Sequence, residues 1–463
     1  MEVESNEQFL IFYHWSMVLS RHRLATGPNP NAVLSSFWQD CAEILWLPGW
    51  GGSGFSVLAI DPVANMEVQN GFHMDQLRAF CQRNLLLSEV RFVGPDSLFA
   101  GPLAGGVFGL LSYEATFSME RLRAIQTRSL GYPCARFGYF PVVFVHEQAT
   151  GDWYLSGQLD AYPDLAESLA ERFHRQGRVP PAITGESATL TVQVTQEEYS
   201  GWVQAARNRI ANGDIYQANL AHPIGVRGTE SLPALFSRIH SSNPSPWACL
   251  VKSPAFSLLS NSPELLLKVE DRQVVAKPIA GTRPRGSDTA SDEKHRRNLL
   301  RSPKERAEHL MLVDLVRNDL GRVCVPGTVE VPVLMDREPY QNVTHIVSTV
   351  VGTLNMGNDE LDALAAVFPG GTITGTPKLR SIEVIDSLEA YPRGFYTGSL
   401  GYINHSGDME FNILIRTLQL KESQEGWEGL LHVGAGIVAD SNPAREYQET
   451  LHKAEAWRRI LCG

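Results

Sequence analysis

The spacing of apolar residues predicts runs of strands interrupted by a few helices. In residues 1–175 the segments GFSVLAIDP, GGVFGLLSYE, FGYFPVVFVHE and DWYLSGQ are rich in aromatic and β-branched residues and are bounded by Gly and Pro, which is typical of strands. Between them, Leu77, Phe80 and Cys81 fall at i, i+3 and i+4, which predicts a helix with one apolar face. A second helix is predicted over 164–175.

The best internal boundary is the segment RQGRVPPAITGESA, residues 175–188, which is rich in Pro, Gly and small polar residues. It separates an N-terminal region, 1–175, from a second region, 190–463, and we expect the two to form one compact unit. Just after the boundary, Thr195 and Glu198 form a capping box that predicts the start of a helix.

The second region is again dominated by predicted strands, among them ACLVKSP, FSLLSNS, ELLLKVEDRQVVAKPI, HIVSTVVGTL, GSLGYI, EFNILIRTLQL and LLHVGAGIVAD. A long helix is predicted from Ser302, with Pro303 in its first turn, Glu305 completing a capping box and Gly321 ending it. Further helices are predicted over LRSIEVIDSLE and from residues 441–443 onward.

Strands that come in runs, without strict alternation with helices, favour an α+β fold with large, mainly antiparallel sheets. The composition supports a globular protein, because 43% of the 463 residues are hydrophobic and 20% are charged. The net charge of -11 disfavours a nucleic acid or an anionic membrane as partner.

The remaining global features predict a cytoplasmic protein. The six cysteines are scattered and include no pair with metal-binding spacing, which is expected of a reduced compartment. The N-terminus MEVESNEQFLIFYHW is acidic where a secretory signal needs basic residues, and no apolar run is long enough to span a membrane.

Two predicted helices carry carboxylates that could bind a metal. Glu308 and Asp314 lie on the helix from Ser302, where a solvated face with ion pairs such as Asp314 with Arg317 is the simpler interpretation. On the last helix Glu446 and Glu449 share one face with a lysine at i+7, and carboxylates on one face are suitable ligands for Mg²⁺. A solvated face is the alternative here as well.

Other segments could contact an anionic ligand. FPGGTITGTPK offers flexible backbone and the cation of Lys378, although it lacks the pattern of a phosphate-binding P-loop. Arg416 interrupts an apolar strand and therefore needs an anionic partner, which could be a protein carboxylate or a substrate. Glu264 is either a strand-end ion pair or a positioned acid, and His345 is either a core histidine or a site residue.

Taken in order, the segments NSPELLL, PIAGTRPRG, RAEHLMLVDLVRNDLGRV, HIVSTVVGTL, FPGGTITGTPK, GSLGYI, IRTL, GAGIVADS and EYQETLHKA resemble the chorismate-utilising enzymes. The match covers about 195–460, and GGVFGLLSYE extends it into the variable N-terminal region of those enzymes. The resemblance implies their fold, an α/β sandwich of large antiparallel sheets flanked by helices, in agreement with the pattern of strands.

The resemblance also implies a site for chorismate. The implied catalytic residues are Glu264, which would assist loss of the C4 hydroxyl, His345 and Lys378. The implied Mg²⁺ ligands are Glu308, Glu446 and Glu449. The substrate-binding residues implied by the same motifs are Ala280, Gly281, Thr282, Thr372, Tyr402, Arg416, Gly436 and Lys453.

Gln217 indicates which branch of the family the chain resembles. The water-using isochorismate and salicylate synthases carry a lysine at the matching position, which activates water, and glutamine cannot act as that base. Ammonia is already a nucleophile and does not need a base of that strength. Gln217 therefore favours an ammonia-using enzyme. Since the sequence contains no G-x-C-x-G glutaminase motif, nitrogen would arrive as free ammonia or from a separate glutamine amidotransferase subunit.

The product depends on one position. FPGGTITGTPK, IYQANL and EYQET resemble aminodeoxychorismate synthase component I of folate biosynthesis, which makes 4-amino-4-deoxychorismate. Those enzymes carry a nucleophilic lysine at the position of Ala280. Anthranilate synthases, like this chain, have alanine there. Anthranilate synthase component I, which releases anthranilate and pyruvate, is therefore the alternative. The remaining alternatives are an isochorismate or salicylate synthase and an inactive homologue that only binds a partner.

Overall fold

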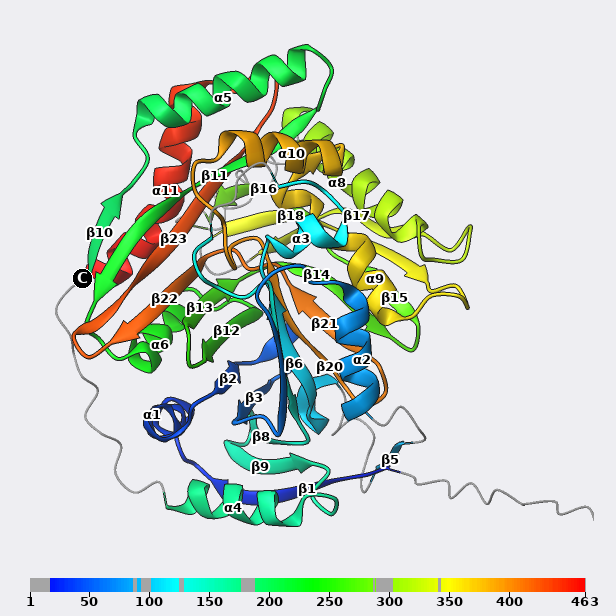
Figure 1. The fold of residues 1–463 in the computed structure, drawn as a ribbon, viewed down its shortest axis with the longest axis vertical. Coiled ribbons are helices and arrows are strands. Elements are labelled where there is room, and N and C mark those ends of the chain that lie inside the picture. The colour runs from blue at the N-terminus through cyan, green and yellow to red at the C-terminus, as the bar shows by residue number, and fades with distance from the viewer. Residues whose placement is uncertain are drawn as a thin grey trace, which may run out of the picture.

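A computed structural model describes residues 17–85, 90–92, 101–124, 129–175, 188–285, 288, 303–339 and 343–462. In this part of the chain the strands form two large sheets, and every strand pair is antiparallel except β1 with β5. Helices cover the outer face of each sheet (Figure 1). The predicted α+β fold, an α/β sandwich, is therefore confirmed.

The larger sheet contains, in order of hydrogen-bonded neighbours, β10 (Thr189–Val192), β11 (Gln217–Gly228), β23 (Gly426–Ile437), β22 (Thr417–Ser423), β13 (Ser257–Ser262), β12 (Trp247–Lys252), β2 (Ile44–Leu47), β3 (Phe55–Ile60), β8 (Val142–Glu147), β9 (Asp152–Gly157), β1 (Met17–Thr26) and β5 (Val90–Phe92), with β19 (Gly375–Thr376) also paired to β11. The smaller sheet contains β16 (Ile279–Pro284), β18 (Val343–Thr353), β15 (Gln273–Ala276), β14 (Leu265–Glu270), β21 (Met409–Asn412), β20 (Ser399–Ile403), β6 (Gly106–Leu111), β7 (Ala135–Phe140) and β4 (Ala64–Val68), with β17 (Glu330–Pro339) paired to β18.

The helices are α1 (Pro30–Asp40), α2 (Met74–Asn84), α3 (Ala115–Met119), α4 (Pro163–His174), α5 (Gln196–Ala211), α6 (Leu232–Ser242), α8 (Pro303–Gly321), α9 (Glu360–Val367), α10 (Lys378–Leu388) and α11 (Pro443–Cys462), and the short 3-10 turns are η1 (Trp50–Gly52), η3 (Gly101–Ala104) and η4 (Gly371–Ile373). The structure describes no helix that is long and apolar enough to cross a membrane.

The two-residue period of the strands builds the layers of the core. In β2, Ile44 and Trp46 face the cluster under α1, α4, α6 and α11, whereas Leu45 and Leu47 face the cluster between the sheets. In β6, Phe108 and Leu110 face that same inner cluster, while Val107 and Leu111 face the cluster under α2, α8 and α9. Both sheets are therefore buried on both faces.

Strands of the two sequence regions pair directly, since β2 is hydrogen-bonded to β12 and β6 to β20. This pairing favours the expectation that 1–175 and 190–463 form one unit. The predicted capping box is present, with the Thr195 side chain accepting from the backbone N–H of Glu198. Ser302, the predicted cap of α8, lies outside the described residues.

One predicted strand is wrong. EFNILIRTLQL was expected to form a single strand, but β21 belongs to the smaller sheet and β22 to the larger one. Residues 413–416 carry the chain from one sheet to the other, and Arg416 adopts a left-handed backbone with a φ of 52°. Arg416 therefore lies at a crossing between sheets and not within a strand.

Candidate active site

Two segments cross between the sheets side by side. The chain passes from β13 to β14 through Glu264, and from β21 to β22 through Arg416. The backbone N–H of Ile413 donates to the Glu264 carbonyl at 3.0 Å, and that of Asn261 donates to the Arg416 carbonyl at 3.0 Å. The fold therefore fixes an acid and a cation on adjacent backbones at the junction of the sheets.

Glu264 has the surroundings of an acid that retains its proton. It is 5% exposed, and Thr372 donates its hydroxyl to Oε1 at 2.8 Å. Burial raises the pKa of the Glu264 carboxyl to about 7, although the Thr372 hydrogen bond and the charge of Arg416 act in the opposite direction. A carboxyl with this pKa is protonated in a large share of molecules near neutral pH, as a general acid requires.

His345 belongs to the same group. It lies on β18, is 4% exposed, and its imidazole is hydrogen-bonded to the backbone of Gly281 on β16. Burial, with a further contribution from the charge of Arg416, lowers the pKa of His345 to about 4, so the imidazole is neutral near pH 7. The charge of Arg416 therefore acts on both His345 and Glu264.

The turn PIAGT lies next to this histidine. Ala280 is 8% exposed on β16, and the strand bulges between Ala280 and Thr282. Gly281, inside the bulge, has a φ of +80°, which glycine adopts without strain. The side chain of Thr282 lies outside the described residues.

A second group of polar side chains lies where β11 meets β23. Gln217 is 3% exposed and donates from Nε2 to Glu308 Oε1 at 3.0 Å, which links β11 to α8. Its own Oε1 is buried and has no hydrogen-bond partner in the described structure. A Cβ added to Gly436 would lie 2.6 Å from Gln217 Nε2 and 3.4 Å from Glu308 Oε1, so a larger residue here would force the Gln217 amide to move.

The last helix adds charged groups at the same strand. Lys453 donates from Nζ to the Gly434 carbonyl at 2.8 Å and pairs with Glu449 at 3.0 Å. Glu446 is half-buried, and the charges of Glu446 and Glu449 both raise the pKa of the Tyr199 phenol after the larger effect of burial. Both carboxylates therefore lie within electrostatic reach of that hydroxyl.

No group of three or more His, Cys, Asp or Glu side chains in the described residues is close enough to hold a metal ion. Glu308 is hydrogen-bonded to Gln217, and Glu449 is paired with Lys453. The predicted ligand set has the right chemistry for Mg²⁺, namely carboxylate oxygens, and Gly436 leaves room beside Glu308. Asp314, in contrast, pairs with Arg317 at 2.9 Å on the surface of α8, as the simpler interpretation expected.

Two of the predicted residues lie in other surroundings. Lys378 is 6% exposed, pairs with Asp319 at 2.6 Å and donates to the Val367 carbonyl at 2.9 Å, so its ammonium group ties α10 to α8 and α9. Tyr402 is 2% exposed in the core between the sheets, where its ring lies 6.1 Å from that of Phe108.

A different tyrosine lies at the glycine-containing strand. Tyr396 is 6% exposed, its ring stacks on His432 at 5.2 Å, and its hydroxyl would lie 3.0 Å from a Cβ added to Gly434. It was not among the predicted residues, because the stretch PRGFYTG carries no periodic pattern. Its only signal was its place just ahead of GSLGY.

Arg393, also not predicted, holds several of these segments together. It is 1% exposed and pairs with both carboxylate oxygens of Glu389, at 2.9 and 2.6 Å. It also donates to the carbonyls of Asn219 at 2.6 Å and Ile373 at 2.9 Å, which adjoin Gln217 and Thr372 in sequence. A small cavity of about 20 Å³ adjoins Glu264 and Thr372, enough for about one water molecule.

Comparison with known proteins finds a family match over most of the chain. A family model described as chorismate binding enzyme matches residues 38–459. The chain is 37% identical over 411 residues to anthranilate synthase component 1 of Methanothermobacter thermautotrophicus, covering 88% of this chain and 85% of that protein. It is 35% identical over 435 residues to aminodeoxychorismate synthase component 1 of Bacillus subtilis, covering 89% and 90%.

Two solved structures share the fold. Anthranilate synthase component I from Streptococcus pneumoniae superposes with a TM-score of 0.75 at 28% identity, covering 88% of this chain and 92% of that one. The menaquinone-specific isochorismate synthase from Escherichia coli superposes with a TM-score of 0.74 over 96% of this chain and 94% of that one, and at 16% identity this likeness concerns the fold alone.

Proposed function

Since the chain belongs to the family of chorismate-binding enzymes, we propose that it catalyses the Mg²⁺-dependent amination of chorismate by ammonia. The observation that carries the proposal is Glu264, a buried acid whose pKa is raised to about 7 at the junction of the sheets. Hydroxide is a poor leaving group, so the C4 hydroxyl of chorismate must receive a proton before its bond to carbon breaks. Glu264 would supply that proton.

The bonds change in a balanced way. The ammonia nitrogen forms a bond to C2, both ring double bonds shift by one position, and the C4–O bond breaks to release water that carries the proton from Glu264. The nitrogen then loses a proton, which restores the acid. Arg416 and Lys453 would pair with the carboxylates of chorismate, and the neutral His345 would donate or accept a hydrogen bond without adding charge.

Gln217 supports ammonia as the nucleophile. Its side chain occupies the position beside Glu308 where a water-using enzyme would need a base, and an amide cannot remove a proton from water. Its buried Oε1, which lacks a partner in the described structure, can accept an N–H hydrogen bond from ammonia. Ammonia needs orientation rather than deprotonation by a strong base.

The metal would be held by the carboxylates of Glu308, Glu446 and Glu449. When bound, Mg²⁺ would supply positive charge to a substrate carboxylate. The chain's own contribution is the glycine at 436, which leaves the Glu308 carboxylate accessible, and the hydrogen bond from Gln217, which orients it.

We propose 4-amino-4-deoxychorismate, a folate precursor, as the product, because the motifs FPGGTITGTPK and IYQANL resemble the synthases that make it. In a second step, a second ammonia would form the bond to C4 while the double bonds shift back and the first nitrogen leaves C2 as ammonia, since Ala280 cannot form a covalent adduct. Anthranilate is the second candidate, and the methyl side chain of Ala280 is the observation that favours it. In either case the nitrogen would arrive as free ammonia or from a separate glutamine amidotransferase subunit.

The test is product analysis of the purified protein with chorismate, Mg²⁺ and an ammonium salt at alkaline pH. A product that is converted to 4-aminobenzoate only after addition of a separate lyase supports 4-amino-4-deoxychorismate. Anthranilate with an equal amount of pyruvate, formed without any lyase, would reject that product and establish the second candidate.

A further inference from the structure

One buried cation, Arg393, is hydrogen-bonded to the main chain on two sides of the candidate site. It is 1% exposed and lies between α10 and β20. Its Nη2 donates to the Asn219 carbonyl at 2.6 Å, and its Nη1 donates to the Ile373 carbonyl at 2.9 Å. These two carbonyls belong to β11 and to η4, so one guanidinium joins two segments that are far apart in the sequence.

The first of these segments carries the group that would orient ammonia. Asn219 follows Gln217 by two residues on β11, and residues two apart on a strand face the same side. The backbone of this part of β11 is held further by the Asn219 N–H, which donates to the Thr374 carbonyl at 2.8 Å. A bond to the Asn219 carbonyl therefore fixes the strand from which the Gln217 amide reaches Glu308.

The second segment carries the group that holds the acid. Ile373 directly follows Thr372, whose hydroxyl donates to Glu264 at 2.8 Å. The direct link between the two segments, from Asn219 Nδ2 to the Thr372 carbonyl, is 3.4 Å long and therefore weak. The shorter bonds through Arg393 are better suited to fix the distance between the segments.

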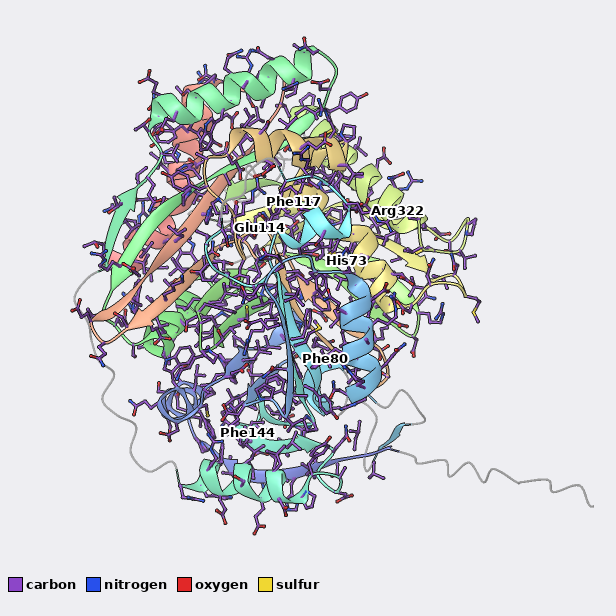
Figure 2. All side chains as sticks on the ribbon, in the orientation of Figure 1. His73, Phe80, Glu114, Phe117, Phe144 and Arg322 are labelled. Atoms are coloured by element: carbon purple, nitrogen blue, oxygen red, sulfur yellow. The ribbon has the colours of Figure 1, made fainter. Side chains whose placement is uncertain are left out.

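Arg393 is itself held from several directions. Its guanidinium pairs with both oxygens of Glu389, at 2.9 and 2.6 Å. Glu114, which Figure 2 labels just ahead of α3, accepts from the backbone N–H groups of Arg393 and Gly394 at 2.9 and 3.0 Å. Gln419 donates to the Arg393 carbonyl at 2.8 Å. The side chain and the main chain of this residue are therefore both fixed.

A purely structural ion pair would not need this arrangement. An apolar pair of the same volume often supports a fold as well as a buried ion pair does, but it cannot donate to carbonyls. A guanidinium has five N–H donors spread over three nitrogens, so it can bond to a carboxylate and to two separate carbonyls at the same time. Arg393 uses its donors in this way.

We propose that Arg393 is a positioning residue for the amination. Through the carbonyls of Asn219 and Ile373 it sets the distance between the amide that orients ammonia and the acid that protonates the leaving hydroxyl. The inference rests on the proposed function, which gives Gln217 and Glu264 these roles. In the described structure the guanidinium hydrogen-bonds to none of the residues assigned to chorismate, ammonia or Mg²⁺.

Steady-state kinetics of Arg393→Lys tests the proposal. Lysine keeps a cation opposite Glu389, but its donors lie on one atom and cannot reach both carbonyls from the same place. We expect kcat to fall by about 10², because the nucleophile and the acid are no longer aligned. The KM for chorismate should stay within about threefold, because no contact with the substrate is removed.

Arg136→Lys is the matched control. Arg136 is a half-buried cation on β7 that pairs with the carboxylates of Glu43 and Glu67, away from the candidate site. This variant should keep both kcat and KM. The proposal would be overturned if Arg393→Lys kept a kcat within about threefold of the wild type, or lost activity only through a higher KM for chorismate.

A second variant keeps the test decisive if Arg393→Lys does not fold. Arg393→Met combined with Glu389→Gln leaves no unpaired charge in the core. The glutamine oxygen can still accept the Ala221 N–H, which bonds to Glu389 at 2.8 Å. The double variant should show the same loss of kcat, and wild-type turnover in it would overturn the proposal.

The protonation of Glu264 provides a readout that needs no turnover. The Thr372 hydroxyl, the backbone of Ile279 and the charge of Arg416 all lower the pKa of this carboxyl against the larger effect of burial. If η4 shifts, the Thr372 bond weakens, and the pKa of Glu264 should rise in Arg393→Lys but not in Arg136→Lys. The infrared band of the protonated carboxyl, identified by its absence from Glu264→Gln, reports the midpoint.

The two readouts separate the two proposals. A wild-type chain that forms no aminated product would reject the proposed function. A Glu264 midpoint that is the same in Arg393→Lys and in the wild type would overturn the positioning role, whether or not the wild type is active.

Discussion

Replacement of Glu264 by glutamine separates the acid's role from its contribution to folding. The amide keeps the size of the side chain and can still accept the Thr372 hydroxyl at its oxygen, but it has no proton to donate to a leaving group. We therefore expect kcat to fall by about 10²–10⁴, the usual effect of losing a general acid.

The stability effect can be worked out from the pKa. The carboxyl has a pKa of about 7 in the folded protein against 4.5 as the reference value, a difference of about 2.5 that corresponds to about 3 kcal/mol. Between these pKa values the unfolded chain binds fewer protons than the folded one, so rising pH lowers the free energy of unfolding. This decrease in the free energy of unfolding is absent below about pH 4.5 and complete above about pH 7.

Because glutamine does not ionise, the free energy of unfolding of Glu264→Gln should not show this decrease with pH. The difference in unfolding free energy, variant minus wild type, should increase by about 3 kcal/mol from about pH 4.5 to about pH 8. Urea titrations followed by tryptophan fluorescence at both pH values measure it, and Glu425→Gln, at an exposed position, is the control. A difference that stays the same at both pH values would refute the reasoning, because Glu264 would then ionise as it does in the unfolded chain.

The remaining predictions concern the metal site and the buried ion pair. Glu308→Gln should abolish Mg²⁺-dependent turnover while the melting midpoint is kept, and retained turnover would remove this residue from the metal site. Gly436→Ala should lower turnover at least about tenfold, because its methyl would lie 2.6 Å from Gln217 Nε2 and displace the amide that orients Glu308, whereas Gly201→Ala, with open space around it, should be neutral in the same assay. Asp319→Asn should lower the free energy of unfolding by about 3–5 kcal/mol, since it leaves the buried Lys378 without its anion, and a loss below about 1 kcal/mol in urea titrations would contradict the role of that pair.

Helices were predicted well where a capping box or a regular spacing of apolar residues marks them in the sequence. The capping box of Thr195 and Glu198 defined the start of α5, and the apolar spacing of Leu77, Phe80 and Cys81 defined the buried face of α2. Helices α1 and α6 were not identified, because neither begins with a capping box and each reads as an apolar segment among others.

The site was less accessible to sequence reasoning, since it depends on where the chain changes sheets. The apolar run through Arg416 looks like one strand, and nothing in its alternation indicates that β21 and β22 belong to different sheets. Motif resemblance proposed Glu264, His345 and Glu308 as site residues, and the structure shows the neighbours of each. The resemblance named Tyr402, which the structure places in the core between the sheets, and it did not name Tyr396, whose hydroxyl lies against Gly434.

The central claim is that ammonia, and not water, attacks chorismate. It is tested most directly by one reaction run with ¹⁵N-ammonium in ¹⁸O-water, with Mg²⁺ and the purified chain, followed by mass spectrometry of the ring product. We predict a product that carries ¹⁵N and no ¹⁸O, as expected if Gln217 orients ammonia beside Glu308. A ring product that carries ¹⁸O and no ¹⁵N would contradict the account.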